Sequence, residues 1–240
     1  MIQERLSLLP AALPDYRPFA PAADRAVWEG LPQAVKARFL QAGKAALAQP
    51  IVPLPLSLWQ DFLRTGQRTP WENALFSRRA RLCGMVCAEC VEHAGRFTQA
   101  IADTVWAICE ESAWQLPAHN SYIRDTPQLP LPDTSRPIVD LFAAEAGALL
   151  ALTRYLLGPE LEAAAPGLPA RMERELRTRI LMPYFQDHFW WMGNGDEPMC
   201  NWTSWCTQNV LLTVLLLPAT QAERQAAVRQ AAYSLDCFLK

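Results

Sequence analysis

Apolar residues recur along most of the chain at the three-to-four-residue spacing of helices, and no segment shows the alternation of a half-buried strand. Prolines and glycines fall between these periodic stretches, where they end helices without interrupting them. The sequence therefore predicts an all-α protein. The expected helices cover residues 22–47 with a break near 30–32, 56–63, 69–93, 97–111, 135–157, a segment starting at 169, 202–217 and 221–240.

Two of the helix starts have the spacing of a capping box, in which a Thr and a Glu three residues later bind each other's backbone N–H groups. One is Thr69 with Glu72, and the other is Thr220 with Glu223. Before the first helix, residues 1–21 are rich in proline and lack periodicity. We expect this segment to be an extended strap, and residues 22–240 to form one helical domain.

Apolar helices alternate with charged ones along the chain. Residues 138–157 are apolar almost all round, whereas the helix from Pro169 places Glu175 and Arg179 four residues apart on a charged face. This alternation predicts consecutive antiparallel hairpins in two layers. Because the last helix reaches Lys240 without a C-cap glycine, we expect the chain to be truncated at its C-terminus.

Composition and charge exclude several classes of protein. The hydrophobic fraction of 51% and charged fraction of 19% are typical of an ordered globular protein. A net charge of −2 provides no field to attract nucleic acid or an acidic membrane, and the longest strongly apolar run, 210–217, is too short to cross a bilayer. No signal peptide is recognisable, and the seven cysteines are an odd number. We expect reduced thiols and a cytoplasmic protein.

Cys83, Cys87 and Cys90 have the C-x3-C-x2-C spacing that ligands of an iron–sulfur cluster can show. Here this spacing also places them on one face of a helix, without the loop that usually carries such ligands. We interpret the three cysteines as small buried hydrophobic residues, and we expect no cofactor.

Two stretches combine aromatic residues with polar side chains beside a turn. They read WAICEESAWQLPAHN (106–120) and FWWMGNGDEPMCNWTSWCTQN (189–209). In the first, Trp106 and Trp114 are expected in the core, which leaves a rim of Glu110, Glu111, His119 and Asn120. In the second, a wall that could stack sugar rings is formed by Trp190, Trp191, Trp202 and Trp205. Hairpins that turn at the same end of a helical layer would bring both stretches to one cleft.

Simpler interpretations remain open for these residues. His119 and Asn120 can be ordinary polar groups at a helix end, and Asn201 can be an N-cap. Adjacent Glu110 and Glu111 point about 100° apart on a helix, so at most one of them faces a cleft. His188 fits either packing or ligand contact.

Five segments occur in the order WAICEESAWQLPAHN, VDLFAAEAGALLALTRYLLG, RTRILMPYF, WWMGNG and NWTSWCTQN. Together they resemble the N-terminal helical domain of heparinase II/III-like proteins, a group of polysaccharide lyases, over residues 70–240. The resemblance implies an incomplete (α/α) toroid of antiparallel helical hairpins. It also implies β-elimination at a uronic acid of an acidic oligosaccharide, with a proton-transferring tyrosine in a further C-terminal portion beyond Lys240.

The resemblance also implies roles for individual residues. Asn201 matches the second asparagine of a pair that leads a helix in the family, and Cys200 replaces the first. We expect the catalytic residues to be Asn201, His119 and Asn120, and the substrate-binding residues to be Trp190, Trp191, Trp202 and Glu111. On its own, the 240-residue chain is expected to bind acidic oligosaccharide weakly and to turn it over negligibly. Alternatives are a toroidal glycoside hydrolase that uses Glu110 or Glu111 with a second carboxylate, and a non-catalytic carbohydrate-binding domain.

Overall fold

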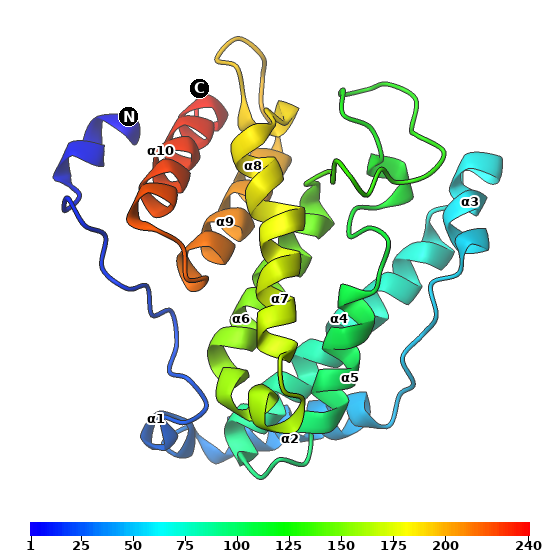
Figure 1. Cartoon of the computed structure of the whole chain (residues 1–240), viewed down its shortest axis with the longest axis vertical. Coiled ribbons are helices and arrows are strands. Elements are labelled where there is room, and N and C mark those ends of the chain that lie inside the picture. The colour runs from blue at the N-terminus through cyan, green and yellow to red at the C-terminus, as the bar shows by residue number, and fades with distance from the viewer. The chain divides into compact units, whose positions relative to one another are not determined.

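The computed structural model describes all 240 residues, Met1–Lys240, and confirms the all-α prediction, since it contains helices and no strands (Figure 1). Its α-helices are α1 (Arg25–Glu29), α2 (Gln33–Leu47), α3 (Leu56–Thr65), α4 (Thr69–Glu92), α5 (Thr98–Cys109), α6 (Leu141–Ala164), α7 (Leu168–Leu176), α8 (Met182–Gln186), α9 (Asn201–Leu216) and α10 (Gln221–Phe238). Shorter helical segments are η1 (Gln3–Leu8), η2 (Pro117–His119), the π-helical η3 (Arg177–Leu181) and η4 (Trp190–Met192).

The chain divides into two compact units, and each combines stretches that are distant in sequence. Unit 1 comprises Met1–Tyr16, Ala113–Ala151 and Glu175–Lys240. Unit 2 comprises Arg17–Ser112 and Leu152–Arg174.

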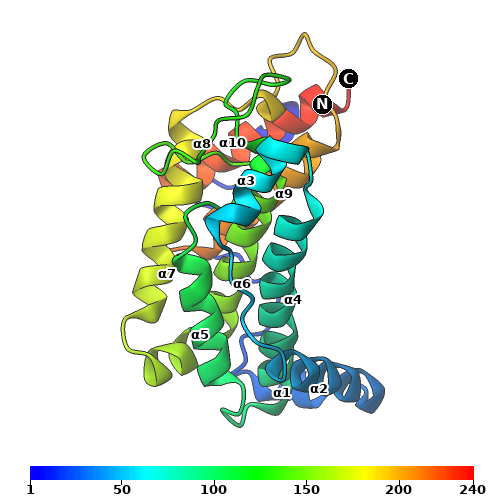
Figure 2. The ribbon, with the colours of Figure 1, turned by 90° about the vertical axis from the view of Figure 1, so that its right-hand side faces the viewer.

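In unit 2, α4 is the central helix and contacts α1, α2, α3 and α5 (Figure 2). Gly43 lets α2 cross α4 closely, because a Cβ at this position would lie 2.2 Å from the Cβ of Ala88. The turn into α5 is held by buried Glu89, whose carboxylate accepts the backbone N–H groups of Gly95 (2.7 Å) and Phe97 (2.9 Å). Fully buried apolar side chains along α4 complete this core.

In unit 1, α9 and α10 pack side by side, and η1 contacts α10 (Figure 1). The unit 1 part of α6 approaches η3 and α9 at Gly147, where a Cβ would lie 2.9 Å from Cγ1 of Ile180 and 3.2 Å from Oγ1 of Thr213. A glycine here therefore permits a close contact that any side chain would prevent.

Both ends of α6 differ from the prediction. The helix begins at Leu141 and not at Ser135, because residues 136–140 are not helical and Asp140 accepts the N–H groups of Phe142 (3.1 Å) and Ala143 (2.7 Å). It also continues past Pro159 to Ala164. Leu157 leaves the helical conformation there (φ −130°, ψ 19°), which accommodates the proline that would otherwise clash with the preceding turn.

Of the two expected capping boxes, one forms. Thr220 accepts the N–H of Glu223 at 3.2 Å and donates its own N–H to the Glu223 carboxylate at 2.7 Å. Thr69 instead is the first residue of α4, which has no side-chain cap, and Glu72 forms an ion pair with Arg68 at 2.7 Å. That prediction was wrong because Thr69 already has helical geometry.

Helix α6 is long and apolar enough to span a membrane by length and composition. Half of its most apolar stretch is buried inside the protein, and the core helix of a globular protein meets the same criteria. This helix is therefore weak evidence for a membrane location.

Candidate functional site

Unit 1 contains a pocket of about 310 Å³ that brings the two predicted aromatic stretches together. Three parts of the chain line it: the loop from Ala118 to Gln128, residues Ile138 and Val139 before α6, and the segment from Phe189 to Trp202 that includes η4 and the start of α9. His119, Trp190, Trp191 and Trp202 are all among the lining residues. The pocket therefore unites residues about eighty positions apart in the sequence.

His119 is the titratable residue of the pocket with a buried acidic partner. Its Nδ1 lies 2.6 Å from Oδ2 of Asp140, and 11% of its side chain is exposed. The imidazole ring packs edge-on against the ring of Trp202, with 4.6 Å between the centroids. It also stacks on the ring of Phe142, with 6.0 Å between the centroids. A proton on Nδ1 that is donated to Asp140 leaves the lone pair of the imidazole on Nε2, which is the arrangement of a general base oriented by a carboxylate.

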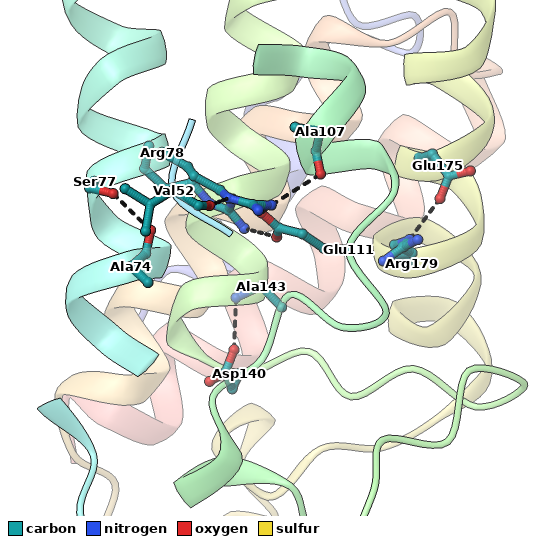
Figure 3. A network of polar contacts seen from close by, with 11 residues as sticks. Val52, Ala74, Ser77, Arg78, Ala107, Glu111, Asp140, Ala143, Glu175 and Arg179 are labelled. Carbon is teal, nitrogen blue, oxygen red and sulfur yellow. Dashed lines mark hydrogen bonds and ion pairs between the residues drawn. The ribbon is translucent and has the colours of Figure 1, made fainter. Parts of the chain in front are cut away.

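Asp140 is fully buried, and backbone donors compensate its charge. Besides His119, it accepts the N–H group of Ala143 at the start of α6 (Figure 3), that of Phe142, and that of Leu116 at 3.2 Å. The N-terminus of a helix favours a negative charge at this point. Asp140 therefore caps α6, ties down the loop at Leu116, and orients His119.

An aromatic surface forms one side of the pocket. The rings of Trp190 and Trp202 contact each other with 4.9 Å between their centroids and an angle of 41° between their planes. Trp191 is buried, stacks on Phe189 at 5.7 Å, and donates its indole N–H to the carbonyl of Val139 at 2.8 Å. Trp190 and Trp202 are therefore the half-buried rings available to a ligand, while Trp191 supports them.

The loop from Ser121 to Gln128 supplies polar groups that we did not single out in the sequence. Arg124, the cation of the lining, lies with its guanidinium carbon 4.7 Å from the ring centroid of Trp190, and its Nε is 3.4 Å from the exposed carboxylate of Asp125. Gln128 has a buried Oε1 without a hydrogen-bond partner. The pocket therefore offers a cation beside its aromatic wall, whereas the unused acceptor of Gln128 is buried.

Tyr122 also lines the pocket, but other groups already bind its hydroxyl. The hydroxyl donates to the carbonyl of Arg136 at 2.8 Å, and the Arg136 guanidinium stacks on the tyrosine ring at 4.1 Å. Burial, followed by the nearby charge of Asp133, raises the pKa of Tyr122. The tyrosine is thus held protonated at neutral pH, and it suits a structural role or hydrogen-bond donation better than that of a base.

The two asparagines that we expected to be catalytic do not line the pocket. Asn120 is fully buried: its Oδ1 accepts from Gln115 at 3.1 Å, and its Nδ2 donates to the carbonyl of Leu129 at 2.9 Å. It therefore closes the base of the loop. Asn201 is the exposed first residue of α9, between the lining residues Cys200 and Trp202.

Three further aromatic or polar candidates also lie outside the lining. Trp205 is 43% exposed. His188 lies with Nε2 3.0 Å from the carbonyl of Gly193. Trp106, expected in the core, is 53% exposed, whereas Trp114 is buried as expected. The Trp106 prediction was wrong because the helical pattern of α5 places this residue on the face that carries Asp103, opposite its buried positions.

Glu111, expected to bind substrate, is part of a buried ion-pair cluster within unit 2 (Figure 3). Its carboxylate binds Arg79 through two hydrogen bonds of 2.5 and 2.7 Å and Arg78 through one of 3.0 Å. Arg78 also donates to the carbonyls of Val52 and Ala107. This geometry stabilises the packing of α4 against the end of α5. The neighbouring Glu110 is exposed and pairs with Arg171 at 3.0 Å.

All seven cysteines are free thiols, and no group of His, Cys, Asp and Glu side chains has the arrangement of a metal site. Of the three on α4, Cys90 is buried as predicted, Cys87 is half-buried and Cys83 is exposed. A hydrogen bond with Cys87 lowers the pKa of Cys83 to about 6, and burial raises the pKa of Cys90 to about 12. The helix face therefore carries one exposed thiol, Cys83, and the hydrogen bond with Cys87 favours its deprotonated form.

No family model matches the sequence, and no curated protein is significantly similar to it.

Proposed function

We propose that the unit 1 pocket binds a uronic-acid residue of an acidic oligosaccharide and that His119 catalyses β-elimination there. The observation that carries this proposal is the contact of His119 with the buried Asp140 at an aromatic-walled pocket. The resemblance of the sequence segments to heparinase II/III-like lyases supports the same reaction.

In this reaction the imidazole Nε2 of His119 takes the proton on the carbon alpha to the uronate carboxylate. The electron pair of that C–H bond forms a C=C bond to the neighbouring carbon, the bond from that carbon to the glycosidic oxygen breaks, and the leaving oxygen takes a proton from water. Asp140 stabilises the imidazolium that forms, because its carboxylate already accepts from Nδ1 at 2.6 Å.

The substrate is held by stacking and by charge. Trp190 and Trp202 form the aromatic side against which a sugar stacks, and Arg124, whose guanidinium lies over the Trp190 ring, is placed to bind the uronate carboxylate. Neutralising this carboxylate makes the adjacent proton more acidic. The amide of Asn201, exposed beside the pocket, is the second group proposed for this contact.

The alternative of a glycoside hydrolase finds less support in the site. Such enzymes use two carboxyl groups on either side of the scissile bond. The pocket lining includes Asp125 as its carboxylate, while Glu111 is bound by two arginines and Glu110 by Arg171.

The same resemblance supports an incomplete (α/α) toroid as the arrangement of the helical hairpins. Free thiols throughout the chain support a cytoplasmic location, and acidic oligosaccharide is the expected partner rather than nucleic acid or a membrane.

The His119→Gln variant tests the proposal. We expect it to lower the rate of elimination by about 10²–10⁴-fold while the dissociation constant for a uronate oligosaccharide stays nearly unchanged, because the variant removes proton transfer and not stacking. Formation of the unsaturated product is followed by its ultraviolet absorbance, and binding by calorimetry. Because the chain alone is expected to turn over slowly, long incubations at saturating substrate are needed.

His188→Gln is the matched control, because His188 lies outside the pocket lining and bonds to a backbone carbonyl. Elimination should proceed in this variant at the wild-type rate. Equal rates in the wild type and His119→Gln, or a wild-type protein that neither binds nor cleaves uronate oligosaccharides, would show that the proposed function is wrong.

A further inference from the structure

Part of the aromatic side of the unit 1 pocket is covered by a side chain of the protein itself. The guanidinium carbon of Arg124 lies over the ring of Trp190, 4.7 Å from its centroid, and both residues line the pocket. A sugar ring that stacks on this face of the indole has to take the place of the guanidinium, because the two groups would fill the same space. This face is therefore open to a ligand only when Arg124 turns away from it.

The side chain of Arg124, and not the loop that carries it, is the part that can move most easily. Two hydrogen bonds between Asn120 and Leu129, of 2.8 and 2.9 Å, close the base of the loop. The Arg124 guanidinium is held by its contact with Trp190 and by an ion pair of 3.4 Å with Asp125, whose side chain is 88% exposed. An exposed ion pair contributes little, and an exposed cation–π contact changes an equilibrium constant by about two- to fivefold. A ligand can therefore displace the guanidinium.

Acidic and neutral saccharides displace Arg124 at different cost. A neutral sugar breaks the contact between the guanidinium and the indole and offers no charged group in its place. A uronate brings a carboxylate, which the planar guanidinium binds through two parallel hydrogen bonds that are stronger than the contact it gives up. Asp125 competes for the same guanidinium, but water screens its exposed carboxylate. The position of Arg124 over Trp190 thus disfavours a neutral sugar more than a uronate.

We infer that Arg124 is a specificity-determining residue of the unit 1 pocket, which covers Trp190 against neutral sugars and leaves this ring for the carboxylate of a uronate. The inference rests on the proposed function for its substrate class, but it concerns which saccharide is admitted and makes no use of proton transfer by His119. It gives Arg124 a second effect beyond attraction of the acid, since the same side chain lowers the affinity for the wrong ligand.

Calorimetry with two matched ligands tests this role: trigalacturonate, and the same trisaccharide with its carboxylates reduced to hydroxymethyl groups. Arg124→Ala should bind trigalacturonate about tenfold more weakly than the wild type, because the charged hydrogen-bond donor is lost. The same variant should bind the neutral trisaccharide about two- to fivefold more tightly, because the Trp190 ring is uncovered. A damaged pocket would weaken the binding of both ligands, so the opposite signs identify the effect of Arg124.

Arg96→Ala is the matched control. The guanidinium carbon of Arg96 also lies 4.7 Å from an aromatic centroid, that of Phe97, but both residues belong to unit 2 and lie outside the pocket lining. This variant should bind both trisaccharides as the wild type does.

Nuclear magnetic resonance observes the contact without any reaction. Side-chain protons of Arg124 that lie over the Trp190 ring should be shifted upfield by the ring current in the free protein, and Trp190→Leu should abolish this shift. Saturation with trigalacturonate should abolish it as well, because the guanidinium leaves the ring for the carboxylate. An upfield shift that persists in the saturated complex would show that Arg124 does not uncover Trp190.

The outcomes separate this inference from the proposed function. If Arg124→Ala binds the neutral trisaccharide no more tightly than the wild type does, Arg124 does not exclude neutral sugars, and elimination at His119 is unaffected by that result. If the two affinities change in opposite directions while His119→Gln slows no elimination, the role of Arg124 stands and the proposed reaction is wrong. A wild-type protein that binds neither trisaccharide would overturn both.

Discussion

Two adjacent glutamates show how burial determines the role of a residue. Glu111 is buried between Arg78 and Arg79, whereas the Glu110 side chain is 50% exposed and pairs with Arg171. Removing one partner of a buried ion pair leaves the other charges uncompensated, but an exposed pair contributes little.

We therefore expect Glu111→Gln to lower the free energy of unfolding by about 3 kcal/mol. Glu110→Gln, one position away and with the same chemical change, should lower it by less than about 1 kcal/mol. Denaturant unfolding monitored by circular dichroism measures both. Similar losses for the two variants would mean that the arginine cluster does not stabilise the fold as its geometry indicates.

At the same scale, the sequence predicted the candidate site only in part. His119 and the tryptophans could be identified because they stand beside turns at helix ends, where a core residue is not required. Asp140 could not, because its role depends on a loop that returns 21 residues later to the start of α6. Arg124 and Gln128 lie in a loop without periodicity, where the sequence gives no sign of which side chains face inward.

Among the helices, the two threonines expected to start helices make a matched pair. Thr220 accepts the N–H of Glu223 and completes a capping box, but no side-chain cap precedes α4 at Thr69. Thr220→Ala should therefore lower the free energy of unfolding by about 1 kcal/mol. Thr69→Ala should change the free energy of unfolding by no more than a few tenths of a kcal/mol, because alanine is favourable inside a helix. Chemical denaturation gives both values, and an equal cost at both positions would contradict the observed caps.

Periodicity and the placement of proline and glycine were enough to predict the helices and most of their ends. The break between α1 and α2 and the end of α4 beside Gly95 were both predicted. Periodicity failed at α6, where local preference competes with tertiary contacts. A helix starting at Ser135 would satisfy local signals, but the non-helical residues 136–140 let Asp140 bind Leu116 and His119 as well as the first turn. Those contacts are made between segments, so no local pattern predicts them.

On the scale of the whole chain, unit 1 joins the first residues to the last helix. Asp236 on α10 accepts the backbone N–H groups of Ile2 (2.7 Å) and Gln3 (3.0 Å), and Gln221 exchanges hydrogen bonds with Leu13. The predicted strap is thus a short helix, η1, followed by an extended segment that is fixed along α10 up to Leu13.

This connection should depend on pH. Burial by itself raises the pKa of Asp236, but hydrogen bonds from the N–H groups of Gln3 and Ile2 outweigh burial and hold the pKa below its usual value of 3.8. A carboxyl whose pKa is lower in the folded state contributes its full stabilisation above the unfolded value, and loses it as the pH falls through the folded value. We expect the amides of Ile2 and Gln3 to be protected from hydrogen exchange at pH 6 and to lose that protection only below pH 3.8, as the pH falls through the lowered pKa of Asp236.

Asp236→Asn should expose these amides already at pH 6 and remove the pH dependence, because a neutral amide cannot replace the charged acceptor. Asp15→Asn is the control on the same segment, since Asp15 is exposed and pairs with Arg224 at 3.2 Å without binding η1. Protection factors normalised to intrinsic exchange rates at each pH, measured by nuclear magnetic resonance, report the result. Amides of Ile2 and Gln3 that stay as protected in Asp236→Asn at pH 6 as they are in the wild type would show that another contact holds the N-terminal segment to α10.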